Sequence, residues 1–222
     1  MTRKTPLEPT RTDQALSALG ELLEAAGAPF EIVVVGGAAL QALGLVLRPT
    51  ADVDVLAIID RELQSADALQ PADALQPPGV LQPADPLPPA LMTAVRRVAA
   101  DFGLPEDWLN PGPTALLQWG LPDGFMARAK QRRYGALTVW FASRYDQIHL
   151  KLFAFADLGG GRHEADLRML RPSREELLAA AAWAQTQDPS EAFRSELLAA
   201  LDLLGVDRTG VDRMGVDDAG LD

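Results

Sequence analysis

The chain has 222 residues and a formal net charge of −11, with no cysteine and only two histidines, His149 and His163. This length is enough for one good-sized domain, or for a core domain with a small helical one. The absence of cysteine excludes disulfides and thiolate chemistry, and two histidines argue against a histidine-built zinc site, so any metal should be held by oxygen. The acidic charge argues against a protein that coats nucleic acid.

The apolar runs of the sequence predict no membrane span. The longest, Ile32 to Val35 and Val53 to Ile59, have the length of strands. The N-terminus also lacks the apolar region of a signal peptide. We therefore expect a cytoplasmic protein without a membrane partner.

The first sixty residues alternate between helical and strand patterns. Asp13 is the predicted cap of the first helix, and Gly27 its stop. Gly36 and Gly37 are predicted to open a tight turn after the first strand. The predicted elements are a helix over 13–26, a strand over 31–35, a short helix over 38–43 and a strand over 51–59.

Two repeats interrupt this organisation. Leucines recur every six residues between Leu63 and Leu87, in copies of the type Leu-Gln-Pro-Ala-Asp-Ala. Because proline breaks helices and central strands, residues 63–90 are predicted to be an inserted, mostly extended or disordered linker. Three five-residue copies that begin with Gly-Val-Asp, and a final Gly-Leu-Asp, fill residues 205–222, which are predicted to be a disordered tail.

The remaining segments predict one more strand and several helices. Ser173 and Glu176 are spaced as a capping box, and Asp188 is the predicted cap of the last helix, with Pro189 at its first position. The predicted elements are a helix over 91–102, a strand over 137–142 and helices over 145–156, 177–183 and 191–204.

A basic cluster lies between Gly124 and Gly135 and has two interpretations. It could meet the phosphates of a nucleotide or an RNA, or it could be a solvated loop or helix face. Its members are Arg128, Lys130, Arg132 and Arg133.

Two carboxylates, Asp52 and Asp54, are the main candidates for chemistry. Side chains two residues apart on a strand point to one face, about 7 Å apart, so both can reach the same divalent metal. They follow the Gly36-Gly37 turn, where backbone N–H groups can approach phosphate because no Cβ intervenes. The short helix after the turn also offers its N-terminus to an anion. Such a site suits nucleotidyl transfer, in which Mg²⁺ holds the triphosphate.

The same residues fit two competing hypotheses. Asp52 and Asp54 could be ordinary strand-end acids, since a lone D-x-D tripeptide is common. A Rossmann site would also combine a strand, glycines, a helix and a later acid. It requires G-x-G-x-x-G, however, and residues 36–41 read GGAALQ.

These residues also carry a resemblance to a known family. The segment 33–40, VVVGGAAL, followed by 48–55, RPTADVDV, is similar to the fingerprint of the polymerase-β-type nucleotidyltransferase superfamily. Its Gly-Gly variant most resembles the AbiEii-like, toxin-type branch. Residues 146–170, in which Lys151 is followed by an arginine and aspartates, resemble the helical segment of that branch.

The resemblance implies a fold, a cofactor and site roles. The fold would be α/β (α+β): a minimal nucleotidyltransferase core with a small mixed sheet flanked by helices, formed by residues 1–62 and 91–144, and a helical C-terminal part over 145–204. The enzyme would use Mg²⁺ or Mn²⁺ and an NTP. Gly36 and Gly37 would cradle phosphates, Lys151 would contact a nucleotide phosphate, and the catalytic metal ligands would be Asp52 and Asp54.

One departure from the family pattern leaves two hypotheses open. A third carboxylate is common on a later strand, yet residues 137–142 contain none. Either Asp157, Glu164 or Asp166 replaces it from the helical part, or the protein is a degenerate member. The first hypothesis is an enzyme, toxin-like and with a cognate antitoxin-like partner, that transfers a nucleoside monophosphate to a hydroxyl on RNA or protein. The alternative is a non-catalytic module that binds nucleotide or protein.

Overall fold

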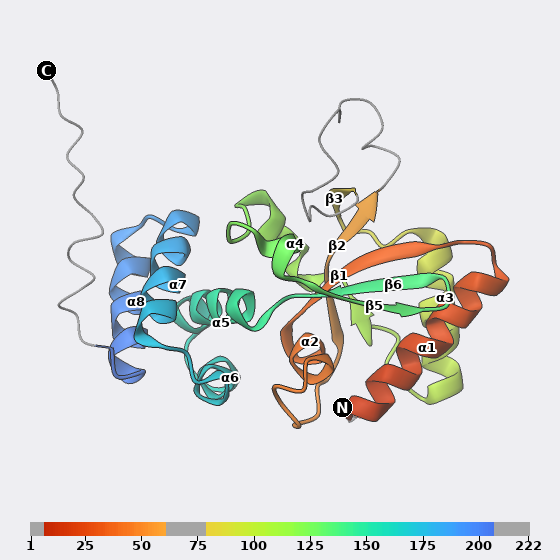
Figure 1. Cartoon of the computed structure of the whole chain (residues 1–222), viewed down its shortest axis with the longest axis horizontal. Coiled ribbons are helices and arrows are strands. Elements are labelled where there is room, and N and C mark those ends of the chain that lie inside the picture. Colours follow the sequence, from red (N-terminus) through yellow and green to blue (C-terminus); the bar gives the residue numbers. More distant parts are fainter. Residues whose placement is uncertain (1–6, 61–78, 207–222) are drawn as a thin grey trace, which may run out of the picture. The chain divides into compact units, whose positions relative to one another are not determined.

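The computed structural model describes residues 7–60 and 79–206, which form two compact units that divide between Ser143 and Arg144. The first unit is a mixed six-stranded sheet flanked by helices, and the second is helical (Figure 1). The predicted α/β fold class is therefore confirmed. No helix of the described ranges is long and apolar enough to cross a membrane.

The sheet of the first unit has the strand order β3-β2-β1-β6-β5, with β4 paired to β2 as well. β1 lies antiparallel to β2 and parallel to β6, β2 lies antiparallel to β3 and parallel to β4, and β5 and β6 form an antiparallel hairpin. The strands are β1 (Phe30–Val35), β2 (Val53–Asp60), β3 (Val80–Pro83), β4 (Leu109–Asn110), β5 (Lys130–Tyr134) and β6 (Leu137–Phe141).

Helices α1 and α3 cover one face of this sheet and bury its apolar side chains. The buried indole of Trp108 donates from Nε1 to the carbonyl oxygen of Val95 on α3, at 3.1 Å, so its polar atom is satisfied inside the core. The helical segments of the first unit are α1 (Pro9–Ala25), α2 (Gly36–Ala42), α3 (Pro89–Phe102), the 3₁₀ helix η2 (Gly112–Gln118) and α4 (Phe125–Arg128).

Gly20 in the middle of α1 allows this helix to pass very close to β5. A Cβ atom at this position would lie 1.7 Å from the carbonyl oxygen of Tyr134. Glycine normally weakens a helix interior, but here the missing side chain allows the helix and the strand backbone to touch. The backbone N–H of Ala136 also donates to the Gly20 carbonyl, at 3.3 Å.

Residues 79–90, the described end of the predicted linker, are not an extended or disordered linker. Residues 80–83 form β3 on the open side of β2, and Ala84 and Leu87 are buried in the core. The prolines permit this because Pro83 ends an edge strand, where a missing N–H costs little. Pro89 then begins α3 two residues earlier than the predicted helix. The rest of the repeat, and the tail from residue 207, lie outside the described residues.

The second unit, as far as residue 206, consists of four helices, with α5 packed against each of the others. Their aromatic contacts include Phe153 with Phe193, whose ring centroids lie 5.2 Å apart, and Phe153 with Trp183, at 6.1 Å. The helices are α5 (Arg144–Leu158), α6 (Arg162–Leu170), α7 (Arg174–Gln187) and α8 (Glu191–Leu203).

The N-terminal caps of α1, α7 and α8 confirm one prediction and correct two. Ser173 and Glu176 form the predicted capping box, with reciprocal bonds of 3.1 and 2.8 Å. Asp188 is not the cap of α8, because the Oγ atom of Ser190 accepts the N–H of Phe193 instead. Asp13 is likewise not the cap of α1, which begins four residues earlier at Pro9.

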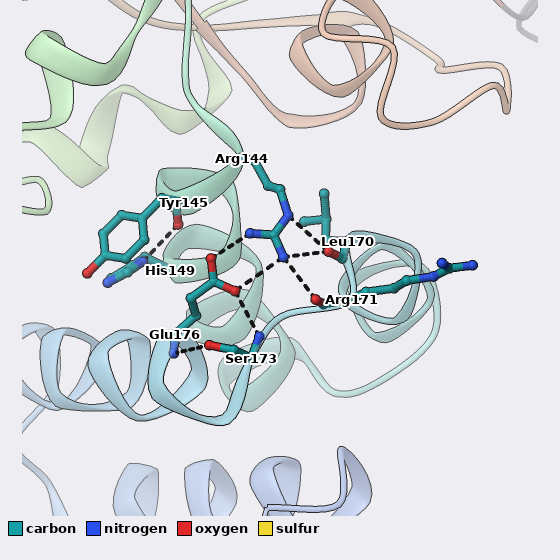
Figure 2. Close-up of polar contacts among 7 residues, drawn as sticks. All are labelled: Arg144, Tyr145, His149, Leu170, Arg171, Ser173 and Glu176. Carbon is teal, nitrogen blue, oxygen red and sulfur yellow. Dashed lines mark hydrogen bonds and ion pairs between the residues drawn. The ribbon is translucent and has the colours of Figure 1, made fainter.

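Arg144, the first residue of α5, joins three helices of the second unit (Figure 2). Its Nε and Nη2 atoms donate to the carbonyl oxygen of Leu170 at 3.0 and 2.7 Å, and Nη2 also donates to that of Arg171 at 2.9 Å. The guanidinium donates to both carboxylate oxygens of Glu176, at 2.5 and 3.2 Å. These bonds from Arg144 lower the pKa of Glu176 below its ordinary value, because they favour the ionised form.

We expect Glu176→Gln to lower the melting temperature at about pH 7, and to lower it progressively less in acid. A carboxyl whose folded pKa is lowered stabilises the fold above the unfolded pKa, about 4.3. That stabilisation is lost as the pH falls through the lowered folded pKa. Melting curves of both proteins between about pH 7 and pH 3 measure the effect. Glu175→Gln, at the exposed neighbouring position, is the control and should change little. An equal decrease for Glu176→Gln at every pH would contradict the assigned pKa shift.

Candidate functional site

Two glycines, Gly36 and Gly37, directly follow β1 and lie against β2. They are the first two residues of α2, so the helix begins two residues before the predicted start at residue 38. We call this first turn of α2 the glycine turn. Gly36 has a φ of +71°, in the left-handed region that favours glycine. A Cβ atom on Gly36 would lie 2.5 Å from Oδ2 of Asp54, and one on Gly37 would lie 2.5 Å from Oγ1 of Thr50. A side chain at either position would require Asp54 or Thr50 to shift, so the two glycines pack directly against a carboxylate and a hydroxyl. The cradling of phosphates by this turn stays a prediction.

The pairing of β1 with β2 places the two carboxylates at the end of the sheet where this turn begins. Asp54 lies opposite Val35, the last residue of β1. Asp52 precedes the first residue of β2, Val53, whose side chain is fully buried. Because Asp52 and Asp54 flank this buried residue and are both partly exposed, they lie on the side of the sheet away from the core. The predicted strand began two residues earlier, at Ala51.

Asn110 is a site residue that the sequence did not predict. The family pattern predicts a third carboxylate on the strand over 137–142, which is β6. This strand pairs with β1 and not with β2, the strand that carries Asp54. The strand directly beside Asp54 is β4, whose Asn110 lies in register with it. The Oδ1 atom of Asn110 accepts the N–H of Gly112 at 2.9 Å. A strand of two residues has no periodic pattern, so only the sheet register identifies this neighbour.

The oxygen atoms of this site fit a hard divalent cation. Carboxylate and amide oxygens are the ligands that Mg²⁺ and Mn²⁺ prefer, and Asp52, Asp54 and Asn110 supply both kinds. Within the described residues, however, no group of three or more Asp, Glu or His side chains could hold a metal ion. Any ion at Asp52 and Asp54 would therefore complete its coordination with water or substrate oxygen, as Mg²⁺ commonly does.

A buried glutamine fixes the loop that leads from α2 into β2. Nε2 of Gln41 donates to the carbonyl oxygens of Leu7 and Arg48, at 2.9 and 2.8 Å, and its Oε1 accepts the hydroxyl of Thr12 at 3.0 Å. Thr50, also buried, exchanges two backbone hydrogen bonds with Leu7, of 2.8 and 3.0 Å. The position of the loop beside the glycine turn is therefore set by the packed N-terminal segment.

Lys151 lies on α5 in the second unit, where it has a carboxylate partner. Its Nζ atom is 2.9 Å from Oδ2 of Asp166, and only 9% of the lysine side chain and none of the aspartate side chain is exposed. Glu164 pairs with Arg168 at 2.9 Å on the exposed side of α6, and Asp157 is exposed near the end of α5. The nucleotide contact of Lys151, and the replacement of the third carboxylate from this unit, stay predictions.

The basic cluster lies mostly on a strand and not on a loop or helix. Its members Lys130, Arg132 and Arg133 belong to the edge strand β5, and Arg128 ends α4. Arg132 donates to the carbonyl oxygen of Ala42 at the end of α2, and its Nη1 lies 3.8 Å from Oδ1 of Asp13. Nε of Arg133 donates to the carbonyl oxygen of Gly135 at 3.0 Å. Arg132 therefore links β5 to α1 and α2, whereas Arg133 bonds within the turn of its own hairpin.

Two hollows of the first unit lie away from the carboxylate pair. One, of 940 Å³, is lined by residues where β1 begins and β2 ends. The other, of 390 Å³, is lined by residues of α1, α2 and β5, including Tyr134. Burial, together with its 2.8 Å bond to Asp13, raises the pKa of Tyr134 to about 12, so its phenol stays protonated at neutral pH. Neither hollow is lined by Asp52 or Asp54.

No family model, no curated protein and no solved structure matches the chain. The resemblance to nucleotidyltransferases therefore rests on the motif residues and stays a prediction. What the structure adds is the proximity of Gly36 to Asp54 and the register that places Asn110 beside them.

We expect Lys151→Met to lower the free energy of unfolding by about 3–5 kcal/mol, because it leaves the buried carboxylate of Asp166 without its partner. The double variant Lys151→Met with Asp166→Leu should regain most of this loss, since it removes both charges. Urea unfolding followed by circular dichroism measures both effects.

The matched control is Arg168→Met, which breaks the exposed pair with Glu164 and should cost about 1 kcal/mol or less. A Lys151→Met variant as stable as this control would show that the buried pair contributes little to folding. Lys151 would then be available for a role with substrate.

Proposed function

We propose that the chain is a Mg²⁺- or Mn²⁺-dependent nucleotidyltransferase, which moves a nucleoside monophosphate from an NTP to a hydroxyl on RNA or protein. The observation that carries this proposal is the close approach of the glycine turn to a carboxylate. A Cβ on Gly36 would lie 2.5 Å from Oδ2 of Asp54. A backbone turn that phosphate can approach thereby adjoins the hard oxygen ligands that divalent cations require.

The proposed roles follow from the chemistry of these groups. Asp52 and Asp54 would hold the metal, which neutralises the triphosphate and favours ionisation of the attacking hydroxyl. In the transfer, the acceptor oxygen bonds to the α-phosphorus while the bond to the pyrophosphate oxygen breaks. Gly36 and Gly37 would cradle the phosphates with their backbone N–H groups.

A second candidate is a nucleotide-binding module without transferase activity. It is favoured by Asn110, which presents an amide at the register position beside Asp54. An amide can donate an oxygen to a metal, but it carries no negative charge and cannot accept the proton of an attacking hydroxyl. Such a site could bind a metal–NTP complex and fail to catalyse the reaction.

The remaining parts of the proposal rest on the sequence resemblance alone. These are a toxin-like role, a cognate antitoxin-like partner and the nucleotide contact of Lys151. The proposed cytoplasmic location rests instead on the apolar pattern of the sequence. They are secondary to the metal and nucleotide site, which is tested first.

We expect NTP binding to require Mg²⁺ or Mn²⁺, and to be lost in the double variant Asp52→Asn with Asp54→Asn. The replacement amides keep the shape of the side chains but remove the charges that hold the cation. Calorimetric titration with each of the four NTPs, with metal and with EDTA, measures the affinity. Melting curves verify that the variant is folded.

The control removes the same number of charges from exposed positions on α1 and α3. Glu21→Gln with Asp101→Asn lowers the net negative charge equally. It should bind NTP as the wild type does. Metal-dependent binding of equal affinity in the Asp52/Asp54 variant would disprove the metal site.

The transfer activity is tested with α-labelled NTPs, total RNA and total protein. We expect the wild type to label one acceptor pool, and the label to disappear with EDTA or with the Asp52/Asp54 variant. If the amide beside Asp54 limits the rate, Asn110→Asp should increase labelling, because it adds a third carboxylate. Metal-dependent NTP binding without transfer by either protein would favour the binding module.

A further inference from the structure

Strand β5 forms one edge of the sheet in the first unit (Figure 1). Its pairing with β6 is antiparallel, so every second residue directs both its N–H and its C=O away from β6. Within the described residues, the backbone of 130–133 makes no hydrogen bonds besides those to β6. At the hairpin end, Gly20 of α1 lies against the carbonyl of Tyr134. The open edge is therefore residues 130–133, which present donors and acceptors to a further strand.

The open edge carries positive charge on both faces of the strand. Side chains alternate in direction along a strand, and all four at 130–133 are exposed. Three of these four are basic, although the whole chain has a net charge of −11. Arg132 has an acid nearby, since its Nη1 lies 3.8 Å from Oδ1 of Asp13. Lys130 and Arg133 form no ion pair with any described residue, so their charges are left for an external partner.

Charge and hydrogen-bonding chemistry together select the kind of partner. The β5 strand of a second copy would place like charges side by side and would be repelled. A nucleic acid would bring phosphates, which accept hydrogen bonds but do not donate to the carbonyl oxygens of the edge. An extended peptide supplies both donors and acceptors, as in the addition of a strand to a sheet edge. Acidic side chains on that peptide supply the opposite charge.

We propose that β5 is a docking edge for an extended acidic segment of a partner protein, which adds a strand to the sheet beside residues 130–133. Backbone hydrogen bonds provide the affinity, and Lys130 and Arg133 select an acidic sequence. The inference does not depend on the proposed function, because β1 and β6 separate β5 from the strand that carries Asp54.

The probe is a short fluorescent peptide of alternating glutamate and valine, and fluorescence anisotropy measures its binding to the full chain. We expect a Kd tighter than about 1 mM. Lys130→Glu with Arg133→Glu should weaken binding about tenfold or more, because two attractive charges become repulsive. The same peptide with every backbone amide methylated should also bind about tenfold more weakly or worse, since it keeps its charge and loses its donors.

The matched control is Arg96→Glu with Arg174→Glu, at exposed positions on α3 and α7, which changes the net charge equally. It should bind the peptide as the wild type does. Melting curves verify that both variants are folded. Should the charge reversal on β5 unfold the chain, Lys130→Gln with Arg133→Gln replaces it and should weaken binding in the same direction.

Several results would overturn the inference. A wild-type Kd weaker than about 1 mM means that the edge takes no acidic strand. Equal binding of the methylated peptide means that charge alone attracts it and that no strand is added. Equal affinity of the wild type and the β5 variant places the peptide elsewhere on the chain. A single-stranded uridine oligonucleotide that binds more tightly, displaces the peptide and loses its affinity in the β5 variant assigns this edge to nucleic acid instead.

Discussion

The register between β1 and β2 is the constraint on which the candidate site depends. Asp54 lies opposite Val35, and the neighbouring Val53 and Val55 are fully buried. A slip of one residue would turn both valines outward and bury the carboxylate, so the apolar face of β2 holds the acids on the other side. The burial that stabilises the sheet therefore also positions the proposed metal ligands beside the glycine turn.

A second constraint is the buried amide of Gln41, which couples the site to the N-terminal segment. A buried side-chain amide is costly unless its donors and acceptor are used. Here both the N–H groups and the oxygen have partners, including the carbonyl oxygen of Arg48. The same bonds that satisfy Gln41 hold the loop carrying Arg48 and Thr50 against α2. Loss of the N-terminal contacts would thus loosen one wall of the site, although no residue of that segment is proposed to touch a substrate.

The sequence predicted the elements whose own side chains fill the core, and it missed those that depend on their neighbours. The apolar runs around Ile32 and Val55 are visible as buried strands without any tertiary information. β5, with the sequence KQRRY, has no apolar alternation and exists because it pairs with β6 and lies under Gly20 of α1. β4 has two residues, and β3 lies within the proline-rich repeat. Asp52 and Asp54 could be selected by spacing, but Asn110 is a neighbour only through the register of β4.

Charge balance indicates what a catalytic site would still require. Two carboxylates neutralise one divalent ion, and Asn110 adds no charge, so a second ion would need a further acid. Within the helical unit, Asp166 is held in its buried pair with Lys151, and breaking such a pair costs about 3–5 kcal/mol. Glu164 would exchange only an exposed pair with Arg168, worth about 1 kcal/mol or less. The pair of Lys151 and Asp166 is therefore the one whose loss would destabilise the helical unit more.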